Sequence, residues 1–305
     1  MISSINKLIA GLLLLGAMPL AAQDDDLFDL LGDDEPVTHY TIATFKSTRL
    51  ISGHSVETNS AGVLQFLIGH RFGRVNSGWR DLYGLDNATI RLGFDYGITD
   101  NLNIGIGRSS FQKTYDAMVK YRFLRQKSGA KSFPITATYV ASMFVRADDW
   151  PHPDRINYFS SRINYHHGLL IARKFGESLS VQLMPSLVHR NLVKTEEDLN
   201  TVASMGAGFS ARVSGSLRVN AEYHYLLPNQ IVSTIGGENV KNSLSIGVDL
   251  ETGGHVFQLH FTNSRGMTEQ YLISETTGSW ADGGIHFGFN VSRVFTVKKP
   301  KAFKE

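Results

Sequence analysis

Apolar and polar residues alternate strictly along residues 87–107, the clearest pattern in the chain. Between Ala88 and Tyr96 every even position is apolar, whereas the odd positions carry Thr, Arg, Gly and Asp. A period of two is that of a β-strand with one apolar and one polar face. Residues 99–101, Thr-Asp-Asn, are typical of a turn, and the alternation resumes at Leu102. The stretch therefore predicts a β-hairpin.

The same alternation recurs through the rest of the chain and predicts twelve strands. Residues 217–225 show it most clearly, because Leu, Val, Ala and Tyr alternate with Arg, Asn, Glu and His. Segments of about ten residues are long enough to cross a bilayer obliquely. The predicted strands cover residues 61–72, 87–98, 101–111, 113–124, 133–146, 157–175, 178–190, 202–214, 216–227, 242–251, 255–263 and 284–297.

The connections between these segments alternate in length. Those after even-numbered strands are mostly tight turns, whereas those after odd-numbered strands are mostly long. The short link near Gln112 and the longer link over 126–132 are the two exceptions. Long loops on one rim and short turns on the other are typical of outer-membrane barrels, with both termini on the periplasmic side. Trp79, Trp150 and Trp280 all fall in long loops, where they are expected to mark the outer interface.

The N-terminus has the features of an export signal. Lys7 precedes an apolar run that ends near Met18, and the small residues Ala21 and Ala22 follow. This pattern predicts a signal peptide over residues 1–22, cleaved before Gln23. A retained anchor is the weaker reading, because the apolar run is short for a bilayer.

Composition narrows the function classes. The formal net charge of the 305-residue chain is only +2, which gives no strong field for nucleic acid. The chain has no cysteine, which excludes disulfides, thiolate metal sites and thiol-linked lipid anchors. A mean hydropathy of -0.12 fits a membrane barrel as well as a soluble protein, since half of each strand is polar.

Alternation does not by itself say which face of the strands points outward. In a soluble barrel the apolar face would point inward, but twelve strands enclose more space than Val and Ala side chains can fill. A two-sheet sandwich is the structural alternative. A closed barrel leaves no unpaired sheet edge, which lipid requires. We therefore predict an all-β fold, a transmembrane antiparallel up-and-down β-barrel of about twelve strands.

Several local runs resemble one known family. These runs are residues 44–55 (TFKSTRLISGHS), 70–73 (HRFG), 84–87 (GLDN), 95–99 (DYGIT) and 105–110 (GIGRSS). They are similar to a Bacteroidota-type outer-membrane β-barrel family, domain of unknown function family 5777, over most of the mature chain. The resemblance implies a barrel and an outer-membrane location, and it supplies no catalytic or ligand residues.

Ionisable residues on the polar face are the candidate functional residues. They carry both signs of charge, so they either form an ion-pair network that holds a narrow barrel shut or line a path for a solute. The lumen-lining candidates are Arg91, Asp95, Asp116, Lys120, Arg122, Arg212, Arg218, Glu222, His224, Asp249 and His260.

Other chemistry is less well supported by the sequence. A Ser-His hydrolase is an alternative, but the chain has no nucleophile-elbow motif. The neighbours His166 and His167 point to opposite faces of a strand, so they cannot hold one metal ion. Oxygen ligands in the loop over 148–154 match no EF-hand spacing, and a solvated loop is favoured. We predict no catalytic residues, no metal and no cofactor.

The segments outside the barrel suggest further contacts. We expect residues 23–58 to form an acidic leader and, over 37–58, an N-terminal segment that covers or enters the periplasmic end of the barrel. Residues 59–297 should form the barrel, and 298–305 a basic periplasmic tail. The leader offers a periplasmic partner the residues Asp24, Asp25, Asp26, Leu27 and Phe28. The predicted function is that of a small-solute channel or transport-related protein, with a non-conducting structural or assembly barrel as the alternative.

Overall fold

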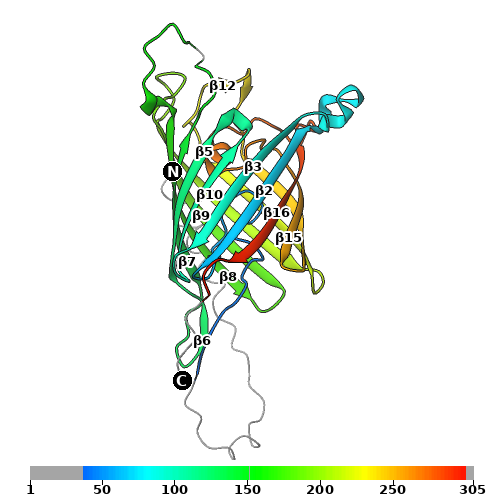
Figure 1. The fold of residues 1–305 in the computed structure, drawn as a ribbon. Coiled ribbons are helices and arrows are strands. Elements are labelled where there is room, and N and C mark those ends of the chain that lie inside the picture. Colours follow the sequence, from blue (N-terminus) through cyan, green and yellow to red (C-terminus); the bar gives the residue numbers. More distant parts are fainter. Residues whose placement is uncertain (1–36, 151, 300–305) are drawn as a thin grey trace, which may run out of the picture. The chain divides into compact units, whose positions relative to one another are not determined.

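The computed structural model describes residues 37–150 and 152–299, and twelve of its strands close into one antiparallel barrel (Figure 1). Each pairs with its neighbour along the chain, and β16 pairs with β2 to close the sheet. This confirms the predicted fold. The barrel strands are β2 (Val63–Arg74), β3 (Ala88–Gly97), β4 (Leu102–Ser109), β5 (Tyr115–Leu124), β7 (Thr136–Val145), β8 (Ile163–Phe175), β9 (Leu179–Arg190), β10 (Thr201–Arg212), β11 (Leu217–Leu226), β14 (Ser243–Thr252), β15 (His255–Thr262) and β16 (His286–Thr296).

The two faces of the barrel wall differ in polarity as the alternation predicts. On β3, Ile90, Leu92 and Phe94 are exposed on the outside, whereas Arg91 and Asp95 are buried on the inside. The same alternation of exposed and buried positions runs through β5, β10 and β11. The exposed outer positions of these strands are mostly apolar, as a hydrocarbon environment requires. The two-sheet sandwich is excluded, because the sheet is closed.

The two rims are also as predicted. The longer connections 75–87, 146–162, 191–200, 227–242 and 263–285 lie at one end, here called the long-loop rim, and the tight turns lie at the other, the short-turn rim (Figure 1). Trp79, Trp150 and Trp280 lie in loops of the long-loop rim. The 3₁₀ turns of this rim are η2 (Val75–Ser77), η3 (Trp79–Gly84), η4 (Phe111–Lys113) and η5 (Phe159–Arg162).

Five short elements were not predicted. Beyond the short-turn rim, β1 (Thr38–Tyr40) pairs with β6 (Lys127–Gly129), and at the long-loop rim β12 (Thr234–Ile235) pairs with β13 (Glu238–Asn239). The fifth is helix α2 (Glu269–Ser274), whose six residues are all buried. The signal peptide and the acidic leader lie outside the described residues.

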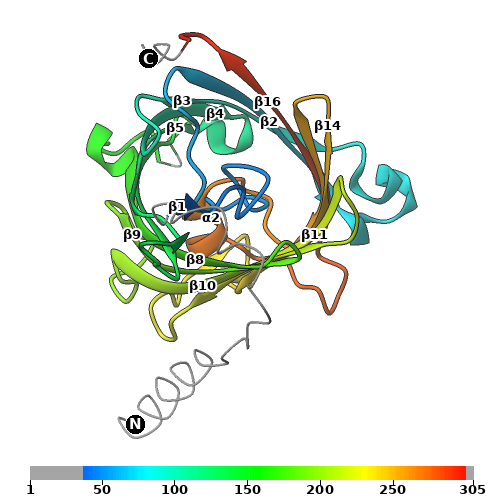
Figure 2. The same ribbon diagram turned by 90° about the horizontal axis from the view of Figure 1, so that it is seen from below.

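Two segments occupy the inside of the barrel. One is residues 44–58, here called the N-terminal plug, and the other is residues 263–277, here called the inward loop, which contains α2. Viewed along the barrel, both lie within the ring of strands (Figure 2). Most residues of both segments are buried. The barrel interior is therefore filled by chain from both ends.

Candidate functional site

Ten of the eleven predicted candidates are buried on the inward face of the wall, each less than 10% exposed. Arg212 is the exception. Its parity is inward, but it is the last residue of β10, and its side chain is 42% exposed beside Glu177 at the short-turn rim. Arg212 therefore does not line the interior.

Glu222 on β11 holds the tip of the N-terminal plug. The plug turns sharply at residues 50–53, where the Leu50 amide donates to the Gly53 carbonyl at 2.8 Å. The next three amides, of Ile51, Ser52 and Gly53, all donate to the Glu222 carboxylate at 3.0–3.1 Å. Successive amides that converge on one point form an anion-binding nest, and here the anion is a wall carboxylate.

Uncharged amide side chains of the wall bind the plug backbone as well. Gln182 on β9 accepts from the Val56 amide and donates to the His54 carbonyl, both at 2.8 Å. Gln258 on β15 donates to the Leu50 carbonyl at 2.9 Å, and Asn290 on β16 donates to the Ile51 carbonyl at 2.7 Å. These residues are absent from the predicted candidates because they are uncharged, and only ionisable side chains were predicted to line the lumen. Their inward parity was the available signal.

The plug and the inward loop meet at Glu269, the first residue of α2. The Glu269 carboxylate accepts from the His54 amide at 3.0 Å and lies 3.6 Å from the Arg49 guanidinium. Burial, reinforced by Arg49 and Lys120, holds the pKa of His54 well below its ordinary value. His54 is therefore neutral, and its ring contact with Glu269 at 3.7 Å is not an ion pair. Arg49 carries the electrostatic link between the two segments.

Arg91 and Asp116 form a bidentate pair inside the wall, with contacts of 3.0 and 2.5 Å between β3 and β5. A Cβ at Gly93 would lie 2.7 Å from Arg91 Nη1, so the absence of a side chain there makes room for the guanidinium. Among the described residues this is the only ion pair that joins two inward strand residues. Two other inward charges pair with the plug instead: Arg122 lies 3.8 Å from Glu57, and Asp95 lies 3.9 Å from Arg49.

One side of the plug packs on apolar wall residues. Phe45, Leu50 and Val56 of the plug form a buried cluster with Val140, Leu170, Ala172 and Met184 of β7, β8 and β9. Lys120 on the adjacent β5 is fully buried and donates to the Thr48 carbonyl at 3.1 Å. The plug thus has an apolar contact on the β7–β9 side and hydrogen-bonded contacts around the rest of the wall.

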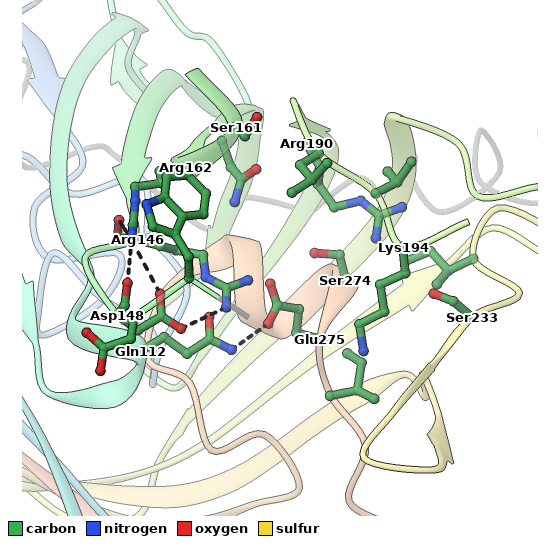
Figure 3. A pocket seen from close by; sticks show the side chains of 17 residues that line it. Gln112, Arg146, Asp148, Ser161, Arg162, Arg190, Lys194, Ser233, Ser274 and Glu275 are labelled. Carbon is green, nitrogen blue, oxygen red and sulfur yellow. Dashed lines mark hydrogen bonds and ion pairs between the residues drawn. The ribbon is translucent and has the colours of Figure 1, made fainter. Parts of the chain in front are cut away.

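A cavity of about 420 Å³ opens at the long-loop rim above α2 (Figure 3). We call it the vestibule. Its floor includes Ser274 and Glu275, and its walls carry four basic and two further acidic side chains. Arg146 donates to Asp148 at 3.1 Å, and Arg162 stacks on the Trp150 ring at 3.8 Å. Apolar side chains, among them Leu192, Val193 and Ile231, share the lining with these charged groups, so the cavity is amphipathic.

A second cavity of about 530 Å³ lies beside the vestibule, and the hydrogen bond from Gln112 to Glu275, 2.9 Å long, separates the two. It is bordered by a latch between the strand wall and the loops. Arg74 donates to Glu238 of the β12–β13 hairpin at 2.6 Å and to Thr277 after the inward loop at 2.9 Å. Hydrogen bonding from Arg74 lowers the pKa of Glu238 to about 2, so the latch is charged at neutral pH.

Metal and hydrolytic chemistry have little in the described residues to build on. No group of three His, Asp or Glu side chains there has the geometry to hold a metal ion. His166 is buried and His167 is exposed on opposite faces of β8. Within residues 37–150 and 152–299, no hydrogen bond joins a serine hydroxyl to a histidine ring.

The closed sheet, the apolar outer face and the polar filled interior define a membrane β-barrel. The sequence profile of one family, described as a membrane-bound beta barrel domain, matches residues 45–295. The chain belongs to this family, domain of unknown function 5777. The match includes the N-terminal plug and the inward loop, so both are parts of the family domain.

Solved structures with a similar fold share little sequence with this chain. The NanC porin has 8% identity and a TM-score of 0.48, over 76% of this chain and 98% of that one. An outer membrane channel from Pseudomonas putida F1 has 12% identity and a TM-score of 0.42, over 79% and 98%. Omp33 of Acinetobacter baumannii has 8% identity and a TM-score of 0.39, over 76% and 97%. No curated protein matches the chain.

Within the described part of the chain, no helix has both the length and the apolar character needed to cross a membrane.

Proposed function

We propose that the protein is an outer-membrane channel for small hydrophilic solutes whose lumen is closed by a displaceable N-terminal plug. The observation that carries this proposal is the polar wall behind the plug. Glu222, Gln182, Gln258 and Asn290 hold the plug by hydrogen bonds to its backbone. If the plug left, the same side chains would line a water-filled pore of the kind that conducts solutes.

The signal-peptide pattern and the family membership support the outer-membrane location. In that location the short-turn rim faces the periplasm and the vestibule faces outward. A solute from outside would first meet the vestibule above α2, with its charged and apolar lining, and would reach the lumen only after the plug and the inward loop had shifted. This order gives the channel a closed resting state.

A non-conducting structural barrel is the second candidate, and a specific observation favours it. Phe45, Leu50 and Val56 pack into a buried apolar cluster with the wall. This apolar packing adds to the hydrogen bonds between the plug and the wall. If the two kinds of contact never break at the same time, the plug stays in the lumen permanently. The two candidates differ in whether the plug can leave the lumen under any condition that leaves the barrel intact.

Locking the plug by a cross-link separates the two candidates. The chain has no cysteine, so a Thr48→Cys, Gln65→Cys pair would be unique, and the hydroxyl and amide oxygens of these residues are 2.8 Å apart. We expect voltage-induced openings of the free-thiol form in planar bilayers, loss of openings after a short reducible cross-linker is attached, and recovery after reduction.

The control pair is Ser214→Cys with Ser216→Cys in an exposed turn of the short-turn rim, where a cross-link does not restrain the plug. Openings should persist in the cross-linked control. Openings of the Thr48–Gln65 variant that are unaffected by its cross-link would show that the plug is not the gate. If neither variant shows openings, with or without the cross-link, although the barrel is shown to be folded, the result would support the non-conducting structural barrel.

A further inference from the structure

Three arginines line a small, partly open cavity between the plug and the wall. Arg49 comes from the N-terminal plug, Arg71 from β2 and Arg91 from β3, and all three line a cavity of about 30 Å³. Each is less than 10% exposed. Three buried guanidinium groups around one cavity concentrate positive charge at a single point inside the barrel.

The three charges are not compensated equally. Arg91 has the bidentate carboxylate of Asp116. Arg49 lies 3.6 Å from Glu269 and 3.9 Å from Asp95, with no hydrogen bond to either. Arg71 is 1% exposed, and among the described residues no carboxylate lies within 4.0 Å of it.

The hydrogen-bond partners of Arg71 are all uncharged. It donates to Ser52 Oγ at 2.7 Å, to Asn290 Oδ1 at 3.0 Å and to the His70 carbonyl at 2.8 Å. Its Nε–H, like the Nε–H of Arg49, is buried and has no partner in the protein. A buried charge without an opposite charge beside it is costly, so this site favours an anion.

The shape of the cavity limits the anion. One water needs about 10–15 Å³ of such space, and the cavity offers about 30 Å³, so it has room for one monoatomic anion. The hydroxyl hydrogen of Ser52 is free to donate, because its oxygen accepts from Arg71. The apolar side chains of Leu67, Ile68 and Met267 also line the cavity.

We propose that this cavity binds one chloride-sized halide, held by the unpartnered Nε–H groups of Arg49 and Arg71 and by the Ser52 hydroxyl. The anion joins the plug, which carries Arg49 and Ser52, to β2, which carries Arg71. Bound halide therefore stabilises the plugged barrel. The site goes beyond channel activity and holds whether or not the barrel conducts.

The experiment measures the urea midpoint for unfolding of the full chain in detergent, with chloride replaced stepwise by isethionate at constant ionic strength. We expect a saturable rise in the midpoint with chloride. The rise should be lost in Arg71→Gln and retained in Arg155→Gln, an exposed loop arginine. Crystals grown in bromide should show an anomalous peak between Arg49 and Arg71.

Arg71→Gln removes a buried side chain, so a second variant covers the case in which it does not fold. Ser52→Ala removes one donor to the anion, and we expect it to shift the chloride dependence to higher concentration. A midpoint that follows ionic strength regardless of the anion would overturn the proposal, as would an unchanged chloride response in Ser52→Ala together with no bromide peak. These readouts do not involve conductance, so their failure is distinct from failure of the channel proposal.

Discussion

Replacement of Glu222 by glutamine should loosen the plug without changing the size of the side chain. In the native barrel Glu222 Oε2 accepts from the Ile51 and Gly53 amides, and Oε1 accepts from the Ser52 amide. A glutamine keeps one acceptor oxygen but places an NH₂ group where the second oxygen was. Whichever way the amide turns, at least one plug N–H then faces a donor.

The size of this effect can be worked out from the contacts. Hydrogen bonds to a charged group contribute about 1.5–3 kcal/mol each, and a buried unpaired donor costs a similar amount. In Glu222→Gln, one hydrogen bond to the plug is lost and the other two no longer have a charged acceptor. Part of this loss is offset, because a neutral amide costs less to bury than a carboxylate. The net destabilisation of the plugged state is about 2–3 kcal/mol. This corresponds to a roughly 30- to 150-fold shift toward the open state.

The assay is the open probability of single channels in planar bilayers, with Glu197→Gln as the matched control. Glu197 is exposed in a loop, so its replacement should leave the open probability unchanged. Heat-modifiable mobility on gels checks that both variants form the barrel. A folded Glu222→Gln barrel that opens no more often than the native protein would refute the assigned role of the carboxylate.

Two further predictions concern the apolar contact and the latch. Leu50→Ala should destabilise the plugged state by about 2–5 kcal/mol, measured as open probability, whereas lipid-facing Leu92→Ala should not, since Leu92 is 41% exposed. The latch from Arg74 to Glu238 depends on pH, because Glu238 has its pKa lowered to about 2. Its stabilising effect is present above the ordinary pKa of about 4.3 and is lost as pH falls through about 2. An NMR titration should show the Glu238 pKa rising toward its ordinary value in Arg74→Gln, and an unchanged value would contradict this.

Most of the barrel could be predicted because lipid and a polar interior impose opposite demands on neighbouring residues. Ile90, Leu92 and Phe94 face outward because lipid requires apolar side chains, and Arg91 and Asp95 face inward because the interior is polar. Two such environments leave a period-two signature in each strand. Turn residues then mark where the strands end, and so which connections form the short-turn rim. The strand pattern and the turn positions can be read without knowing what fills the barrel.

Parity fixes the face of a residue but not its depth in the barrel, and Arg212 shows the difference. It has the inward parity of β10, but it is the last residue of that strand and is exposed at the short-turn rim. A strand boundary that is uncertain by a few residues leaves this open from sequence. The prediction for Arg212 therefore had the right face of the strand and the wrong position along it.

The pattern predicted that residues 37–58 cover or enter one end of the barrel, but it did not predict how the plug is held, nor that the inward loop enters the lumen. Residues 44–58 are held through their backbone amides and carbonyls, which are the same for every sequence. Helix α2 has only six residues and no side-chain cap, so it leaves no periodic signal. The partners Gln182 and Gln258 are uncharged, and a search limited to ionisable groups passes over them.

Thiol accessibility of the plug tests the central claim most directly. Ser55 is fully buried in the N-terminal plug, and Ser55→Cys is nearly isosteric. In bilayers we predict that a charged maleimide does not react with this cysteine at zero voltage and reacts once voltage opens the channel, while exposed Ser214→Cys reacts throughout. Labelling of Ser55→Cys at the Ser214→Cys rate without voltage would contradict the closed, plugged barrel.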